Sequence, residues 1–247
     1  MRVDVLTLFP DLVDAPLSAS IVGRARQTGA LDLNIHDIRT WTSDVHRTAD
    51  DTPYGGGPGM VMKAEPIVSG AEWIAETHGS PGRTYILSAS GKVLNHDLAV
   101  EIAGQEHLLL ICGHYEGIDD RVRTLLSAEE LSIGDYVLTG GELAAAVVID
   151  CVTRLIPGVI KAESVAEESH AAGILEYPHF TRPATFRGLS VPDVLLSGNH
   201  AEINRWRHEQ ALLRTAENRP DLVSRMSDAD RLALLNAPVG DRTSEQE

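Results

Sequence analysis

The chain has 247 residues, 43% apolar and 23% charged, and its 21 Lys and Arg against 36 Asp and Glu give a net charge of −15. These values are ordinary for a globular protein and exclude a disordered or fibrous chain. The longest aliphatic stretch, from Leu143 to Ile149, is too short to span a membrane, and early acidic residues argue against a signal peptide. Cys112 and Cys151 lack metal-ligand spacing, so we expect a soluble, cytoplasmic protein with no metal site and no disulfide.

The first two thirds of the chain alternate between strand and helix patterns. A strand pattern at 3–8 is followed by a helical pattern at 16–27 and by a strand at 31–36, whose apolar and polar residues alternate. Short apolar runs at 84–88 and 108–112 are typical of buried parallel strands. Helical patterns separate or follow these strands at 64–78, 95–104 and 142–155. The rhythm predicts an α/β domain with a largely parallel sheet over residues 1–160.

The pattern changes after Pro157 and Gly158. Residues 161–178 are polar and lack periodicity, which predicts an interdomain linker. Asn199 is a suitable N-cap for a helix that runs to about residue 218, and Ser227 is suited to begin a shorter one. We therefore predict a small helical domain at 179–237 and a disordered tail at 238–247.

Positive charge is concentrated in the C-terminal part. Although overall acidity argues against nucleic-acid binding, the window from His179 to Arg219 holds six arginines against four acids. The planar guanidinium fork suits phosphates and base edges. Both an RNA-binding surface and a solvated helix face with ordinary ion pairs fit this window.

Three glycine-rich segments are candidates for a small-molecule site. The first, Tyr54 to Met60, has neither the Walker pattern nor the dinucleotide fingerprint, and a plain flexible loop fits it as well. Gly113 to Arg121 follows a predicted strand, where open α/β sheets bind ligands. Ser132 to Glu142 leads into a helix and carries apolar side chains that could face a flat heterocycle. Three such loops on one predicted α/β domain favour a small-molecule site over ordinary turns.

These segments resemble those of a known family. Together with Leu8-Phe9-Pro10, Arg154 to Gly158, Pro178 to Pro183 and Leu196-Ser197-Gly198, they run in the order found in the bacterial tRNA (guanine-N1)-methyltransferases, the TrmD family of the SPOUT class. The resemblance implies a parallel-sheet SPOUT fold with a deep trefoil knot, plus a small C-terminal helical domain. It implies S-adenosylmethionine as cofactor, a tRNA substrate, no membrane association, and a homodimer with its active site at the subunit interface. The reaction would methylate N1 of guanosine 37, next to the anticodon.

The resemblance also assigns candidate residues. For the cofactor it implies Ser88, Gly113, Tyr115, Glu116, Gly117, Ile133, Gly134, Asp135, Tyr136, Val137, Leu138, Gly140, Gly141 and Glu176. For tRNA, family matches imply Gly59 and Ser164, and the basic window adds Arg182, Arg187, Arg205, Arg207 and Arg214. Arg154 matches an arginine that stabilises charge at guanine O6, and a helix-end arginine interacting with the dipole is the alternative.

The candidate general base departs from the family pattern. The family usually has an aspartate in an acidic-acidic-Ser motif of the linker, and here Glu168 takes that place, after Glu167. A carboxylate near N1 can remove its proton, but the extra methylene shifts the group by roughly one bond length. We expect Glu168 to be the base. The alternatives are that Glu167 substitutes for it, or that the protein is a non-catalytic RNA-binding dimer that retains the cofactor pocket. An enzyme of the same class with another RNA substrate also fits, whereas a kinase-like enzyme lacks its phosphate-loop lysine.

Overall fold

The computed structural model describes residues 1–161, 168–171 and 173–236. The chain divides into two compact units, residues 1–161 and residues 162–247, and each is described by itself. The predicted tail at 238–247 and part of the predicted linker lie outside the described residues. Among the described residues, no helix combines the length and apolar character needed to cross a membrane.

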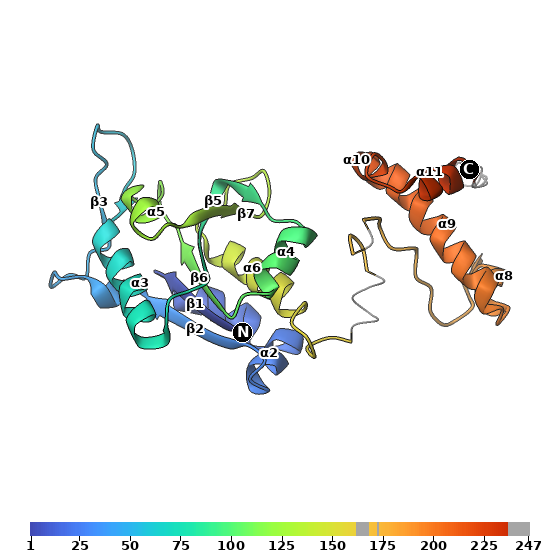
Figure 1. The fold of residues 1–247 in the computed structure, drawn as a ribbon, viewed down its shortest axis with the longest axis horizontal. Coiled ribbons are helices and arrows are strands. Elements are labelled where there is room, and N and C mark those ends of the chain that lie inside the picture. The colour runs from blue at the N-terminus through green and yellow to red at the C-terminus, as the bar shows by residue number, and fades with distance from the viewer. Residues whose placement is uncertain (162–167, 172, 237–247) are drawn as a thin grey trace. The chain divides into compact units, whose positions relative to one another are not determined.

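The first unit is built on a five-stranded sheet in the order β2-β1-β6-β5-β7 (Figure 1). Every neighbouring pair is parallel, which confirms the predicted parallel α/β architecture. The predicted strands appear with boundaries shifted by about a residue, except that the strand expected at 84–88 continues to Val93. The bounds are β1 (Arg2–Thr7), β2 (Asp32–Asp37), β5 (Arg83–Val93), β6 (His107–Cys112) and β7 (Glu129–Ser132).

Helices cover both faces of this sheet. One face packs against α1 (Pro10–Asp14), η1 (Ala15–Leu17), α2 (Ser20–Gln27), α4 (His96–Ala103) and α6 (Glu142–Thr153). The other packs against η2 (Ile38–Trp41), α3 (Ala64–His78) and α5 (Arg121–Leu125). Two short strands, β3 (Asp50–Asp51) and β4 (Val61–Met62), form a separate antiparallel pair.

The prediction of a single helix at 16–27 is wrong for its first turn. A 3-10 turn ends at Leu17, and α2 starts only at Ser20. Ala19 is extended and Ser20 has a φ of +56°, so the chain changes direction between the two helical pieces. Gly29 has a φ of +76° just beyond α2, as expected of a glycine that ends a helix.

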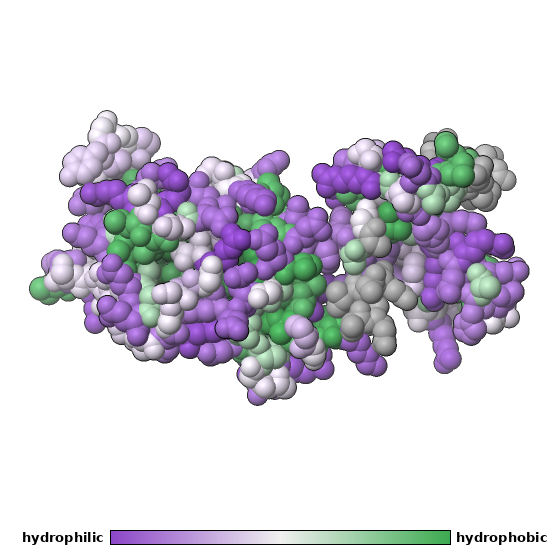
Figure 2. All heavy atoms as spheres, in the orientation of Figure 1, coloured by the Kyte–Doolittle hydropathy of each residue, from purple (hydrophilic) through white to green (hydrophobic). Residues whose placement is uncertain are grey.

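Alternating residues of the strands fill two cores. In β6, Leu108, Leu110 and Cys112 pack with the α6 side of the sheet, whereas Leu109 and Ile111 pack with the α3 side. Because both faces are covered, residues 108–112 of the strand are all apolar, and they form a continuous apolar run in the sequence. The surface drawn in Figure 2 is mostly hydrophilic, with smaller hydrophobic areas between the charged residues.

The second unit is largely helical. It contains α8 (Asp193–Leu196), α9 (His200–Asn218), α10 (Pro220–Val223) and α11 (Asp228–Asn236), with a hairpin of β8 (Thr185–Phe186) and β9 (Leu189–Ser190). The predicted caps are confirmed: the Asn199 side chain accepts from the Glu202 amide, and Ser227 Oγ accepts from the Asp230 amide. The described residues of the predicted linker, 161, 168–171 and 173–178, form neither helix nor strand.

A fully buried carboxylate joins three neighbouring strands of the first unit, β2, β1 and β6. Asp4 on β1 accepts two bonds from Arg2, at 2.7 and 3.0 Å. His36 Nε2 on β2 lies 2.7 Å from one of its oxygens, and His107 Nε2 on β6 lies 2.8 Å from the other. Burial opposes ionisation of Asp4, but the hydrogen bonds from His36, Arg2 and His107 outweigh it and hold its pKa far below the usual range.

Replacing this carboxylate should destabilise the sheet. We expect Asp4→Ala to lower the free energy of unfolding by about 3 kcal/mol, because it leaves Arg2 and two histidines without their shared acceptor. Asp32→Ala removes an exposed acidic partner of the same Arg2 and should cost less than about 1 kcal/mol. Urea denaturation of both variants and the wild type measures the difference.

The same comparison has a defined pH dependence. Because the folded-state pKa of Asp4 is lowered, its stabilising contribution is complete above the unfolded pKa of about 4 and is lost as the pH falls below it. The gap in stability between wild type and Asp4→Ala should therefore narrow on acidification. A gap that widens below pH 4 would contradict this assignment.

Candidate active site

A cavity of about 470 Å³ opens beside the middle of β5 and the carboxyl ends of β6 and β7. Its wall is formed by residues 86–90 of β5, by the end of β7 and by the loops that follow β6 and β7, 113–120 and 133–141. This is the edge at which parallel α/β sheets bind ligands. The second and third glycine-rich segments thus lie on one site, as the sequence predicts.

A bulge in β5 forms one side of the cavity. The pairing of β5 with β7 shifts between Leu87 and Lys92, so the intervening residues leave the regular ladder. A Cβ on Gly91 would lie 2.4 Å from the backbone of Glu130, so only glycine allows the two strands to approach so closely. The bulge places Ser88 and Ser90 on the wall, where Ser90 Oγ donates to Glu130 Oε1 at 3.2 Å.

Close backbone packing forms the base of the cavity. The Gly141 amide donates to the Gly113 carbonyl at 2.7 Å, so the loop before α6 is bonded to the end of β6. A Cβ on Gly141 would lie 2.8 Å from Cys112 Cα, which leaves no room for a side chain. Gly134 has a φ of +150°, and its missing side chain makes room for the Tyr136 ring beside it.

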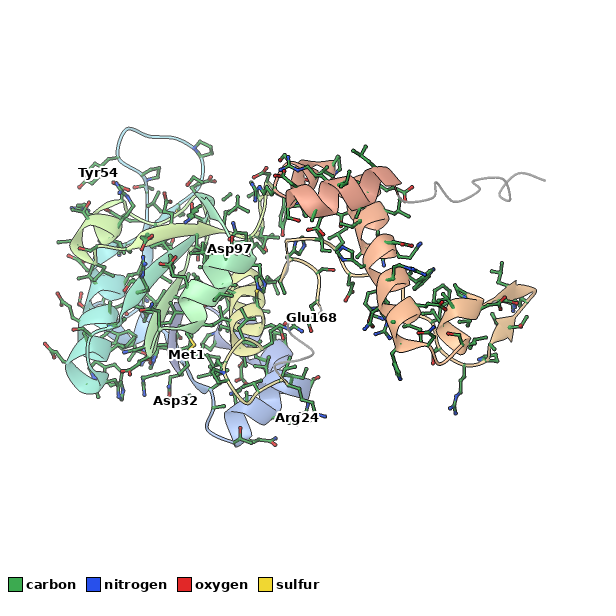
Figure 3. The ribbon with its side chains drawn as sticks, turned by 45° about the vertical axis from the view of Figure 1, so that its right-hand side comes forward. Met1, Arg24, Asp32, Tyr54, Asp97 and Glu168 are labelled. Atoms are coloured by element: carbon green, nitrogen blue, oxygen red, sulfur yellow. The ribbon has the colours of Figure 1, made fainter. Side chains whose placement is uncertain are left out.

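The first glycine-rich segment contacts the second. The Glu116 amide donates to the Met60 carbonyl at 3.1 Å, and the Met62 amide donates to the Gly117 carbonyl at 2.9 Å. A Cβ on Gly59 would collide with the Glu116 side chain, so the predicted tRNA contact at Gly59 lies directly against a predicted cofactor residue. Tyr54 is fully exposed on the same loop (Figure 3).

Acidic side chains dominate the polar lining of the cavity. The lining contains the four acids Glu116, Asp119, Asp120 and Glu130 and one arginine, Arg123, which pairs with Asp120, while Asp119 pairs with Arg121 outside the lining. Hydrogen bonds from arginine side chains lower the pKa of Asp119 and of Asp120, so both stay ionised at neutral pH. Such a lining favours a ligand that carries positive charge.

Behind the cavity lies a buried polar pair. Thr7 Oγ1 donates to Glu142 Oε1 at 2.7 Å, and His114 Nδ1 lies 4.0 Å from the other oxygen of Glu142. Burial raises the pKa of the neighbouring Cys112 thiol well above its usual range, so this cysteine stays protonated and is no nucleophile. The site therefore offers binding and alignment, without a covalent nucleophile at Cys112.

The structure brings together all but two of the predicted cofactor residues. Asp135 lies in the same loop but is exposed outside the lining, and Glu176 belongs to the second unit. The predicted cofactor residues that lie in the lining of the cavity are Ser88, Gly113, Tyr115, Glu116, Gly117, Ile133, Gly134, Tyr136, Val137, Leu138, Gly140 and Gly141. Ser90 and Glu130 also line the cavity, but the sequence analysis does not predict them. Only the pairing of β5 with β7 brings them to the cavity wall, and the sequence carries no signal for that pairing.

The predicted catalytic residue of the first unit, Arg154, does not line this cavity. Arg154 follows the last residue of α6, whose twelve residues span about 18 Å from the cavity end. Glu168 lies in the second unit, where its carbonyl accepts from the Ala171 amide; its side chain is labelled in Figure 3. Ser164 lies outside the described residues.

The predicted tRNA-binding arginines all belong to the second unit. Arg182, Arg187, Arg205 and Arg214 are exposed. Arg187 lies over the Phe186 ring at 5.3 Å, and the partly buried Arg207 lies over the Tyr177 ring at 4.8 Å. Aromatic rings thus accompany two of the cations, a combination suited to nucleobases.

The fold and the cavity define a parallel α/β protein with an acidic, partly apolar cavity at one edge of its sheet, where proteins of this class bind small ligands. The chain belongs to the tRNA (guanine-1)-methyltransferase family, TrmD, whose model matches residues 1–225. It is 60% identical over 240 residues to the tRNA (guanine-N(1)-)-methyltransferase of Thermomicrobium roseum, covering 96% of this chain and 90% of that protein. The proteins of the same name from Chloroflexus aurantiacus and Moorella thermoacetica are 57% and 53% identical, over 93% and 98% of this chain and 90% and 100% of theirs.

A methyl group on Gly141 should disturb the cavity. We expect Gly141→Ala to cost about 2 kcal/mol of unfolding free energy, because the new Cβ would press on the backbone of Cys112. Gly104→Ala is the matched control: its φ is −76° and its Cβ would meet nothing closer than 3.5 Å. Thermal unfolding should give a lower Tm for Gly141→Ala than for Gly104→Ala. Equal Tm values would show that the loop before α6 can move to accommodate the new methyl group.

Proposed function

We propose that this protein transfers a methyl group from S-adenosylmethionine to N1 of guanosine 37 in tRNA. Family membership supports the reaction, and the cavity beside β5 and at the carboxyl ends of β6 and β7 is the observation that carries it. The cavity gathers, on one sheet edge, residues from two separate glycine-rich segments. From the proposed tRNA substrate we infer that the activity is cytoplasmic.

The residues present fit the cofactor. When bound, S-adenosylmethionine supplies an electrophilic methyl group on a sulfonium, and the acidic lining suits its net positive charge. Ile133, Tyr136 and Leu138 offer apolar surface for a flat base. Backbone groups of Gly113 and Gly140 can approach its edge, because neither carries a side chain. A volume of about 470 Å³ lies within the usual range for ligand sites.

We also propose that the cofactor loops form the trefoil knot of the SPOUT class. A knot needs chain segments to pass one another at backbone distance. The approach of Gly91 to Glu130 and of Gly141 to Cys112 supports such passages on both sides of the cavity.

Methyl transfer to guanine needs the N1 proton to leave. In the proposed step the Glu168 carboxylate takes this proton, and Arg154 stabilises the negative charge that develops toward O6. The N1–C bond forms as the methyl–sulfur bond breaks, and the bonding pair stays on sulfur. Most of the rate gain comes from alignment, so the longer glutamate requires the linker backbone to hold the base slightly farther away.

We propose that a second copy of the chain completes the site. The chain's own Arg154 lies at the far end of α6 from the cavity, so a partner's Arg154 is needed there. Leu143 and Val147 form an exposed apolar stripe along α6, with the exposed Leu12 on the neighbouring α1. An apolar stripe of this kind suits a self-complementary two-fold contact.

The second unit is proposed to bind tRNA. Its exposed arginines would neutralise phosphates, and the anticodon loop offers unpaired bases without the cost of opening a duplex. The alternative function is that of a non-catalytic RNA-binding dimer. Its sole support is that a glutamate stands at position 168, where the family usually has an aspartate.

The deciding experiment offers the protein S-adenosylmethionine and an unmodified tRNA transcript with guanosines at positions 36 and 37. Nucleoside mass analysis should find 1-methylguanosine, and a transcript with adenosine at position 37 should yield none. Cofactor and tRNA binding without product would instead favour the non-catalytic reading.

Removal of the Glu168 carboxylate should slow methyl transfer but leave the binding of S-adenosylmethionine unchanged. We expect Glu168→Gln to lower kcat by about 10²- to 10⁴-fold while the Kd for S-adenosylmethionine stays unchanged. Glu217→Gln, an exposed acid at the end of α9, is the matched control and should retain full activity. If Glu168→Gln keeps wild-type kcat, another group removes the proton.

A charge in the α6 stripe should separate the copies. Val147 is 47% exposed in the single chain, so Val147→Glu should fold but lose the dimer and the methyl transfer together. Light scattering and activity on the same sample check this. An active monomer would contradict the shared site.

A further inference from the structure

The second unit has a cavity of its own, of about 420 Å³, that the proposed reaction does not use. It lies between the segment 177–184 and the helices α8 and α9. Its wall is apolar on one side, where Val191, Leu195, Leu196 and Ile203 meet. A volume of this size exceeds what one nucleobase needs, with room for part of its sugar.

Aromatic rings stand beside this apolar wall. Phe180 lines the cavity and is 48% exposed, and Trp206 supports it from α9 with ring centroids 6.3 Å apart. Tyr177 lines the cavity as well. Exposed rings held by a second ring are suited to stacking on a flat partner, because little side-chain entropy remains to be lost.

Two arginines provide donors at the same cavity. The Arg207 guanidinium lies over the Tyr177 ring at 4.8 Å. Its Nε is buried and has no hydrogen-bond acceptor among the residues that the structure describes. A buried donor without an acceptor is costly, and an oxygen or ring nitrogen of a ligand would relieve that cost. Arg182, exposed at the same cavity, can contact a phosphate.

We propose that this cavity binds one unpaired base of the tRNA, other than the guanine that is methylated, by stacking on Phe180 and by a hydrogen bond from Arg207. The proposal rests on the proposed function, since it presumes tRNA as the partner. A free phosphate would leave the apolar wall without a partner, whereas a nucleotide matches both the wall and the arginines.

The test combines a cavity-filling variant with a scan of the RNA. Leu196→Trp puts a large ring into the cavity from a side chain that is 60% exposed, so the fold should tolerate it. tRNA transcripts with a single abasic site at each anticodon-loop position are bound to the wild type and to the variant. Leu232→Trp makes the same change at an exposed position of α11 outside the cavity and is the control.

For the wild type, we expect one abasic site away from position 37 to weaken binding about tenfold. Leu196→Trp should bind the intact tRNA about tenfold more weakly and should be insensitive to that same abasic site. Leu232→Trp should match the wild type throughout. Phe180→Leu, a smaller change, should show the same insensitivity and carries the test if Leu196→Trp fails to fold.

The outcomes separate the two proposals. If the wild type forms 1-methylguanosine but the cavity variants keep its tRNA affinity, or keep its sensitivity to every abasic site, the base-binding cavity is overturned and the methylation stands. Sensitivity confined to position 37 overturns it equally. If the wild type neither binds nor methylates tRNA, both proposals fall.

Discussion

The cavity of the first unit depends on one contact, in which the start of α6 meets the end of β6 with no room for a side chain between them. The Gly141 amide bonds to the Gly113 carbonyl, and a Cβ at position 141 would press on Cys112. This contact holds the loops 113–120 and 133–141 against each other. The lining of the cavity comes from those loops and from the β5 bulge, itself made possible by a second glycine, Gly91.

Much of this arrangement could be predicted from local sequence pattern. The buried part of β6, residues 108–112, is a continuous apolar run in the sequence. The glycines in the loops after β6 and β7 mark these loops as candidates for a ligand site. The bulge at Ser88 to Gly91 could not be predicted, because it depends on which strand lies beside β5. The break before Ser20 was missed for a similar reason: the helical pattern continues across a change of direction that one positive φ creates.

The candidate active site is only partly present within the first unit. Cofactor residues gather at one end of α6, while Arg154 lies at the other end and Glu168 belongs to the second unit. Motif matching assigns all of them to one reaction but carries no information on which copy of the chain supplies each. In the proposed dimer, Arg154 of one copy works with the cavity of the other, so its distance from the cavity of its own chain is no obstacle. The dimer also explains why the apolar side chains of Leu143 and Val147 are exposed along α6 of the single chain.

The central claim, that the cavity of one copy works with Arg154 of the other, is tested most directly by mixing two inactive variants. Ser88→Trp fills the cavity, and Arg154→Ala removes the arginine. When equal amounts are co-expressed, half of the dimers are mixed and each has one intact site, so roughly one quarter of the wild-type methylation rate should return. If the mixture stays as inactive as its components, the cavity and the arginine act within one chain, and the account of a shared site is wrong.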